Sequence, residues 1–133
     1  MSYSATFAVR GKPEPKGSTR AFVPKGWKRA VITSANPKAK VFAELVRWAA
    51  QEHAPEHLLA GPVGVSMVFG IQRPKSAPRS RVHPTTKPDT DKLVRLVLDA
   101  LTGVVWRDDS QVVELAARKE YGEPGVSVTV VEI

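Results

Sequence analysis

Residues 63–71 alternate strictly between large apolar side chains and mostly small ones. The apolar positions of this alternation are Val63, Val65, Met67, Phe69 and Ile71. Successive side chains of a β-strand point to opposite faces of a sheet, so the pattern predicts a strand with one face in the core. Any fold for this chain must therefore be built around a sheet that contains this segment.

The next segment, residues 72–88, holds five basic residues, four prolines and no acidic residue. Proline lacks an amide hydrogen and disrupts helices and central strands, so neither element is expected here. We predict a mobile basic loop. Its composition suits a solvated linker and a DNA-contacting loop equally, and its position directly before a group of aspartates favours contact with DNA.

Two segments show helical periodicity. The first begins at Asn36 and Pro37, a cap followed by a first-turn proline, and ends before Pro55, with its apolar stripe at Val41, Leu45, Trp48 and Ala49. The second runs from about Asp89 to Leu101, has Gly103 as its C-terminal cap, and carries a stripe of Leu93, Leu96, Val97, Ala100 and Leu101. Both patterns predict amphipathic helices.

Further strands are expected at Ala5–Arg10, Gln111–Tyr121 and Val126–Ile133, and residues 12–35 read as a basic surface loop or short hairpin. A chain of 133 residues has room for one core. We therefore predict a single α+β domain over residues 1–133, in which a mixed β-sheet packs against two main helices.

Charge is distributed unevenly along the chain. Fifteen Lys and Arg but only four Glu precede residue 89, whereas all five Asp lie between residues 89 and 109. A net charge of +7 favours a polyanionic partner, and nucleic acid suits the pattern better than a membrane surface, since no long basic amphipathic helix is apparent.

Several classes of protein are disfavoured by what the sequence lacks. The absence of Cys excludes disulfides, thiolate metal sites and cysteine nucleophiles. No signal-peptide pattern and no apolar run of about 18 residues is present. We expect a cytoplasmic protein that has no membrane association, and nothing in the sequence indicates a different protein as partner.

The aspartates form two pairs that a metal ion can use. Asp89 and Asp91 fall in the first turn of the second helix, where either alone is explained by helix capping. A helix of 13 residues is about 18 Å long, and an extended stretch from Gly103 spans a similar length. It can therefore return Asp108 and Asp109 to Asp89 and Asp91. Four converging carboxylates would bind Mg²⁺, with Mn²⁺ as a possible substitute.

Asp99 is separated from this predicted cluster. It lies about 12 Å along the helix axis from Asp91, too far to share its metal ion. We interpret it as an ion-pair partner of Arg95, four residues earlier, or as a polar residue of the packing region.

The stretch KPDTDKLVRLVLDALTGVVWRDDSQVVELAARKEY, residues 87–121, resembles the signature of the RusA family of Holliday-junction resolvases. The N-terminal strand followed by GKPEPKG is also similar to the start of that family. The resemblance implies a RusA-like fold and a homodimeric endodeoxyribonuclease that uses Mg²⁺ to cleave four-way junctions symmetrically in DNA recombination and repair. It also implies a bacterial or phage origin. By resemblance, the essential aspartates are Asp89, Asp91 and Asp109, with Asp108 in support.

The chain departs from the family pattern at two positions. Lys92 stands where most members have Asn, and Arg95 stands where the family has a functional lysine. An arginine keeps the positive charge but cannot readily release a proton, so Arg95 suits phosphate binding and not proton transfer. The alternatives are that Lys92 supplies the missing ammonium, or that Arg95 forms a surface ion pair with Asp91 and Asp99.

The predicted mechanism is metal-assisted phosphodiester hydrolysis at Asp89, Asp91 and Asp109, with Arg95 on the scissile phosphate. The candidate contacts to the DNA backbone, each of which is also consistent with solubilising charge, are Lys16, Arg20, Arg73, Lys75, Arg79, Arg81, Lys87 and Lys92. Trp48 and Trp106 are assigned to the core or an interface. Two alternatives stay open: a metal nuclease that prefers flaps or other branched DNA, and a non-catalytic DNA-binding module.

Overall fold

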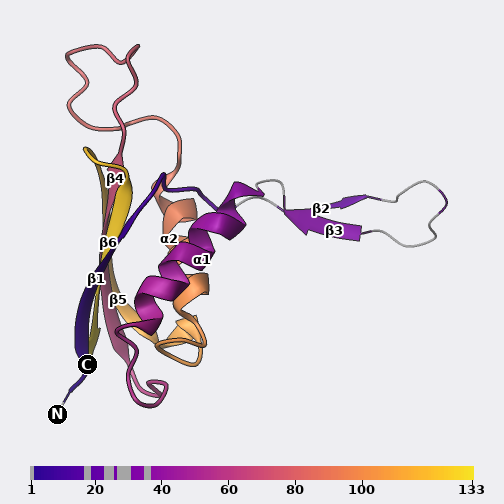
Figure 1. The fold of residues 1–133 in the computed structure, drawn as a ribbon, viewed down its shortest axis with the longest axis vertical. Helices are drawn as coiled ribbons and strands as arrows, with labels where there is room; N and C mark the ends of the chain where they lie inside the picture. Colours follow the sequence, from indigo (N-terminus) through magenta and orange to yellow (C-terminus); the bar gives the residue numbers. More distant parts are fainter. Residues whose placement is uncertain (1, 17–18, 23–25, 27–30, 35–36) are drawn as a thin grey trace.

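The computed structural model describes residues 2–16, 19–22, 26, 31–34 and 37–133 (Figure 1). A four-stranded sheet forms its centre, in the order β1-β6-β4-β5. The strands are β1 (Ser4–Arg10), β4 (Val63–Ile71), β5 (Val112–Tyr121) and β6 (Gly125–Glu132). β4 is parallel to β5 and antiparallel to β6. The sheet is therefore mixed, and the alternating segment forms one of its two central strands, as predicted.

Two helices, α1 (Lys38–Gln51) and α2 (Thr90–Leu101), cover one face of the sheet (Figure 1). The core lies between these layers. The polar residues of α2 occupy one face only, so the opposite, apolar face can pack against the sheet. The predicted stripe on that face is buried in full and consists of Leu93, Leu96, Val97, Ala100 and Leu101. The single α+β domain is thus confirmed. No helix in the described part of the chain has both the length and the apolar character needed to cross a membrane.

The buried face of α1 differs from the predicted one. Phe42 and Val46 face the core, together with two alanines, whereas Val41 and Trp48 are 64% and 66% exposed. This helix carries apolar side chains on two faces, and helical spacing alone does not decide which of them meets the sheet. Trp48 therefore does not belong to the core, and its alternative assignment to an interface stays a prediction. The predicted cap residue Asn36 lies outside the described residues.

Residues 12–35 contain a two-stranded hairpin, β2 (Thr19–Phe22) paired with β3 (Val31–Ser34), that projects away from the sheet (Figure 1). This confirms the hairpin alternative. The side chain of Arg20, a predicted DNA contact, lies outside the part of the chain that the structure describes. Residues 72–88 contain neither helix nor strand, as expected from their four prolines.

The segment after α2 is a compact turn and not the extended return strand that was predicted. Gly103 has a positive φ of 85°, and its amide donates to the Trp106 carbonyl at 2.8 Å. The amides of Val104 and Val105 both donate to the Leu101 carbonyl. The apolar residues of this segment resemble a strand in sequence. Their apolar character has a different cause, because Val105 and Trp106 pack into the core from within the turn.

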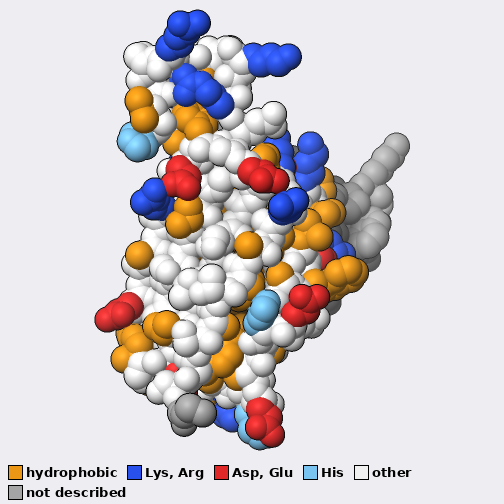
Figure 2. Space-filling view, turned by 60° about the vertical axis from the view of Figure 1, so that its left-hand side comes forward, with side chains coloured by type: hydrophobic (Ala, Val, Ile, Leu, Met, Phe, Trp, Pro, Cys, Tyr) orange, Lys and Arg blue, Asp and Glu red, His pale blue; other side chains and the backbone are white. Residues whose placement is uncertain are grey.

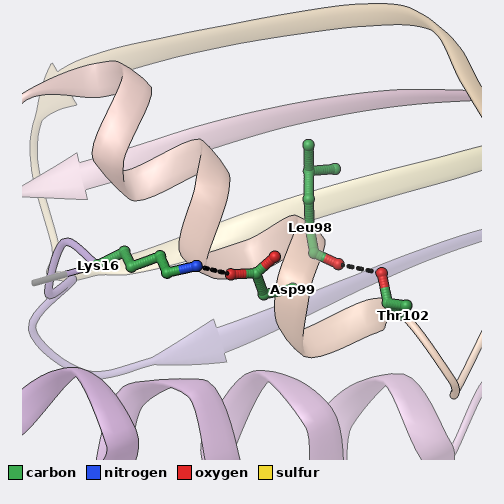
Figure 3. Close-up of polar contacts among 4 residues, drawn as sticks. All are labelled: Lys16, Leu98, Asp99 and Thr102. Atoms are coloured by element: carbon green, nitrogen blue, oxygen red, sulfur yellow. Dashed lines mark hydrogen bonds and ion pairs between the residues drawn. The ribbon is translucent and has the colours of Figure 1, made fainter. Parts of the chain in front are cut away.

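Trp106 anchors this turn. Its side chain is fully buried, and its Nε1 donates to Thr102 Oγ1 at 3.0 Å. Thr102 Oγ1 in turn donates to the Leu98 carbonyl at 2.9 Å, which ties the turn to the last turn of α2 (Figure 3). The assignment of Trp106 to the core is confirmed.

Candidate active site

The first acidic pair lies at the start of α2. Asp89 occupies the N-cap position in an extended conformation, and Asp91 lies exposed in the first turn, as the sequence predicted. Asp89 Oδ2 is 3.7 Å from Lys92 Nζ, and both side chains are about half exposed. The helix N-terminus adds a partial positive charge that favours carboxylates here. Arg95 is also exposed on α2, one turn after Asp91.

The second acidic pair lies in a capped turn before β5. Asp108 Oδ1 accepts a hydrogen bond from the Ser110 amide at 3.0 Å, and Asp109 begins a short 3-10 helix, η1 (Asp109–Gln111). Gln111 Oε1 accepts from the Asp108 amide, which completes a capping box. Both aspartates are exposed. The turn therefore holds two carboxylates at the surface on a hydrogen-bonded backbone.

Gln111 is a positioning residue that the sequence argument missed. Its Nε2 donates to the carbonyls of Leu59 and Gly61, each at 2.8 Å. These bonds tie the acidic turn to the segment before β4. The sequence signal was available, because an Asp followed three residues later by Gln is the spacing of a capping box.

The two adjacent carboxyl groups have different pKa values. The Ser110 amide, followed by the hydrogen bond to Asp109, lowers the pKa of Asp108. The hydrogen bond to Asp108, then a slight desolvation and the charges of Asp108 and Asp99, raise the pKa of Asp109, and the charge of Lys16 opposes this effect. Asp109 is therefore the group of the pair that takes up a proton first as the pH falls.

Replacing Asp108 with asparagine should lower the pKa of Asp109. The substitution removes the negative charge and the carboxylate acceptor that stabilise the protonated form of Asp109, so its carboxyl group should ionise at a lower pH. The measurement is an NMR pH titration of the Asp109 carboxyl carbon in metal-free protein. An unchanged or raised pKa would contradict the assigned cause, and Asp91→Asn serves as a control that leaves the pair intact.

Asp99 pairs with Lys16 and not with Arg95. The Lys16 Nζ lies 2.6 Å from Asp99 Oδ2 (Figure 3), and the Lys16 amide donates to the Lys92 carbonyl at 3.1 Å. The sequence interpretation missed this contact because the two residues are 83 positions apart. Lys16 therefore ties the N-terminal segment to α2, and its ammonium group is already engaged by a carboxylate.

The two acidic pairs lie at opposite ends of α2. A helix of this length extends about 18 Å. The turn that contains Asp109 follows the C-terminal end of α2 (Figure 1). It lies close enough to Asp99 for the charge of that residue to raise the pKa of Asp109. Among the described residues, which include all five aspartates, no group of three or more His, Cys, Asp or Glu can hold a metal ion. The predicted convergence within one chain is wrong, because it required an extended segment where the chain forms a compact turn.

A cavity of about 680 Å³ opens at the N-terminal end of α2. Its walls come from residues 12–16, 71–75 and 86–89, with Lys92, Tyr121 and Pro124. It brings Asp89 together with five of the predicted DNA contacts, which are Lys16, Arg73, Lys75, Lys87 and Lys92. Figure 2 shows that Lys and Arg side chains gather at the end of the molecule formed by residues 72–88. Arg79 and Arg81 belong to this loop but do not line the cavity.

Two residues on β5 shape this cavity. Lys119 Nζ donates to the Thr86 and Pro88 carbonyls at 2.9 and 2.8 Å, which holds the chain just before Asp89. The Arg73 guanidinium lies 5.1 Å from the centre of the Tyr121 ring. Neither Lys119 nor Tyr121 was assigned to the site from the sequence, because the pairing of β5 with β4 that brings them here is visible only in the fold.

The sequence is similar to known proteins over almost its whole length. A family model described as "Endodeoxyribonuclease RusA" matches residues 11–131, a span that includes the cavity walls and both acidic pairs. A protein of Bacillus subtilis (strain 168) that bears the name "Uncharacterized protein YqaN" is 36% identical over 138 residues. That match covers 96% of this chain and 95% of the relative.

Proposed function

Because this chain belongs to the RusA endodeoxyribonuclease family, we propose that it is a Mg²⁺-dependent endonuclease that resolves four-way DNA junctions. The observation that carries the proposal is the cationic cavity that ends at Asp89. Lys and Arg side chains attract the phosphate backbone whatever its sequence. The carboxylate oxygens of Asp89 at the end of such a surface are hard ligands, which suit a divalent cation bound next to a phosphodiester group. The geometry therefore supports a nuclease better than a DNA-binding module.

The proposed metal ligands are Asp89, Asp91 and Asp109, with Asp108 in support. A divalent cation bound by these carboxylates would activate water and stabilise the charge that develops on the phosphate. Mn²⁺ has similar oxygen preferences and should replace Mg²⁺. Arg95 is exposed one helical turn after Asp91 and is proposed to bind the scissile phosphate.

One protomer does not bring these ligands together, so the proposal includes a second copy of the chain. β5 is an edge strand of the sheet, and it begins just after Asp109 and ends beside the cavity that contains Asp89. Two copies that pair through their β5 edges, about a two-fold axis perpendicular to these strands, would have their β5 strands antiparallel. Such an arrangement would place Asp109 of one copy near Asp89 and Asp91 of the other, twice per dimer.

The edge strand has features that favour such a contact. Val113 and Leu115 on β5 are 61% and 49% exposed. An uncovered strand edge with apolar side chains is a ready surface for pairing with another chain. A symmetric dimer with two composite sites would also cut two strands of a four-way junction in equivalent positions, which is the proposed resolution reaction.

The test compares a synthetic four-way junction, a flap and a linear duplex under identical conditions with Mg²⁺. We expect paired, symmetric cuts in the junction and no comparable cleavage of the other two, with EDTA abolishing all activity. Preferential cleavage of the flap would replace the junction assignment with that of a flap nuclease. Binding without cleavage, in Mg²⁺ and in Mn²⁺, would leave only a DNA-binding module.

A further inference from the structure

The cavity at the start of α2 has walls that phosphate binding does not explain. Phosphate groups are bound by cations, and Lys12, Lys75 and Lys87 supply them. The same cavity is also lined by five prolines, Ile71 and Tyr121. Apolar and aromatic surface of this kind suits the flat face of a nucleobase.

The volume of the cavity is consistent with such an occupant. Small-molecule sites enclose about 300–1,000 Å³, and this cavity has about 680 Å³. It is therefore large enough for a nucleotide with its base turned inward. A duplex stem has no base available for this, whereas the branch point of a junction or a single strand does.

Tyr121 and Arg73 both line this cavity, and the Arg73 guanidinium lies over the Tyr121 ring. The two terminal nitrogens of this guanidinium donate hydrogen bonds to the Arg81 and Pro78 carbonyls at 2.7 and 2.5 Å. Rings and guanidinium planes are the groups on which unpaired bases stack. These hydrogen bonds orient the guanidinium over the ring in the absence of a ligand.

The hydroxyl group of Tyr121 is also unusual. It is buried, and it has no hydrogen-bond partner among the described residues. Buried hydroxyl groups are normally paired, because an unpaired one loses its hydrogen bonds to water without replacement. A ligand that displaces neighbouring groups on entry would give this hydroxyl a partner.

We propose that this cavity binds an unpaired nucleobase, with Tyr121 and Arg73 as the stacking surface and the surrounding lysines on its phosphates. The base would belong to a nucleotide next to the cleaved phosphate, because Asp89 lines the same cavity. That placement rests on the proposed function. The cavity would then select which bases are accepted beside the cut.

The experiment measures the affinity of the full chain for a short single-stranded oligonucleotide and for an abasic strand with the same number of phosphates. Wild-type protein should bind the strand with bases about 5- to 150-fold more tightly, the range that corresponds to one stacked base. Tyr121→Ala should lose this preference and keep its affinity for the abasic strand. Tyr121→Phe should retain the preference, and Lys75→Ala should weaken both affinities alike.

Equal binding of the two strands by wild-type protein would overturn the inference, as would an unchanged preference in Tyr121→Ala. Tyr121→Leu, which keeps an apolar side chain without a ring, replaces the alanine variant should that variant fail to fold. Oligonucleotide binding requires neither a junction nor cleavage. A base preference without junction cleavage would therefore reject the proposed function alone, and junction cleavage without a base preference would reject this inference alone.

Discussion

Replacing Asp91 with asparagine should reduce cleavage of a four-way junction about a thousandfold or more. The carboxylate is exposed at the first turn of α2, beside the cationic cavity, and the amide removes a full negative charge from the proposed metal site. Binding of the junction should be retained, because its contacts come from the surrounding Lys and Arg side chains. The measurement is single-turnover cleavage in Mg²⁺, alongside a binding titration in its absence.

Asp99→Asn is the matched control for this variant. Asp99 lies on the same helix, and its carboxylate is paired with Lys16 and not available to a metal ion at Asp91. Cleavage by this variant should remain within a few-fold of wild type. Normal cleavage by Asp91→Asn would contradict the catalytic assignment.

Replacing Trp106 with alanine should lower the free energy of unfolding by about 3–5 kcal/mol. The indole is fully buried, and its Nε1 bond to Thr102 holds the turn that leads to Asp108 and Asp109. The substitution leaves a large cavity and releases that turn. Chemical denaturation measures the change, which is a large part of the total stability of about 5–15 kcal/mol that domains possess.

Trp106→Phe separates packing from hydrogen bonding at the same position. It retains a buried ring but cannot donate to Thr102 Oγ1, so it should cost markedly less than the alanine variant. A loss below about 1 kcal/mol for Trp106→Ala would show that the turn does not depend on this side chain.

The sheet and α2 could be predicted because their patterns were unambiguous. Residues 63–71 carry an apolar residue at every second position, with Val68 the one apolar residue between them, and α2 has one apolar stripe, so each pattern favours a single orientation. α1 has two apolar faces, and the choice between Val46 and Trp48 depends on the shape of the sheet surface opposite. That surface exists only in the folded chain.

The geometry of the site was less predictable than its residues. The aspartates were identified by their grouping along the chain, and Asp89 and Asp91 lie where helix rules placed them. The segment after α2 was predicted to be extended because Val104, Val105 and Trp106 have the composition of a strand. In the structure they belong to a turn, and Val105 and Trp106 are buried in the core. The same error placed all four carboxylates in a site within one chain, whereas the proposed function requires a second copy.

Mixing the Asp91→Asn and Asp109→Asn proteins tests the central claim most directly. Each variant alone has a defect in both sites of a dimer, whereas a dimer of one of each has one site with all of its aspartates intact. Random exchange should therefore restore nicking of a four-way junction to about a quarter of the wild-type rate. A mixture no more active than either variant alone, under conditions where the subunits exchange, would contradict a site that is shared between two copies.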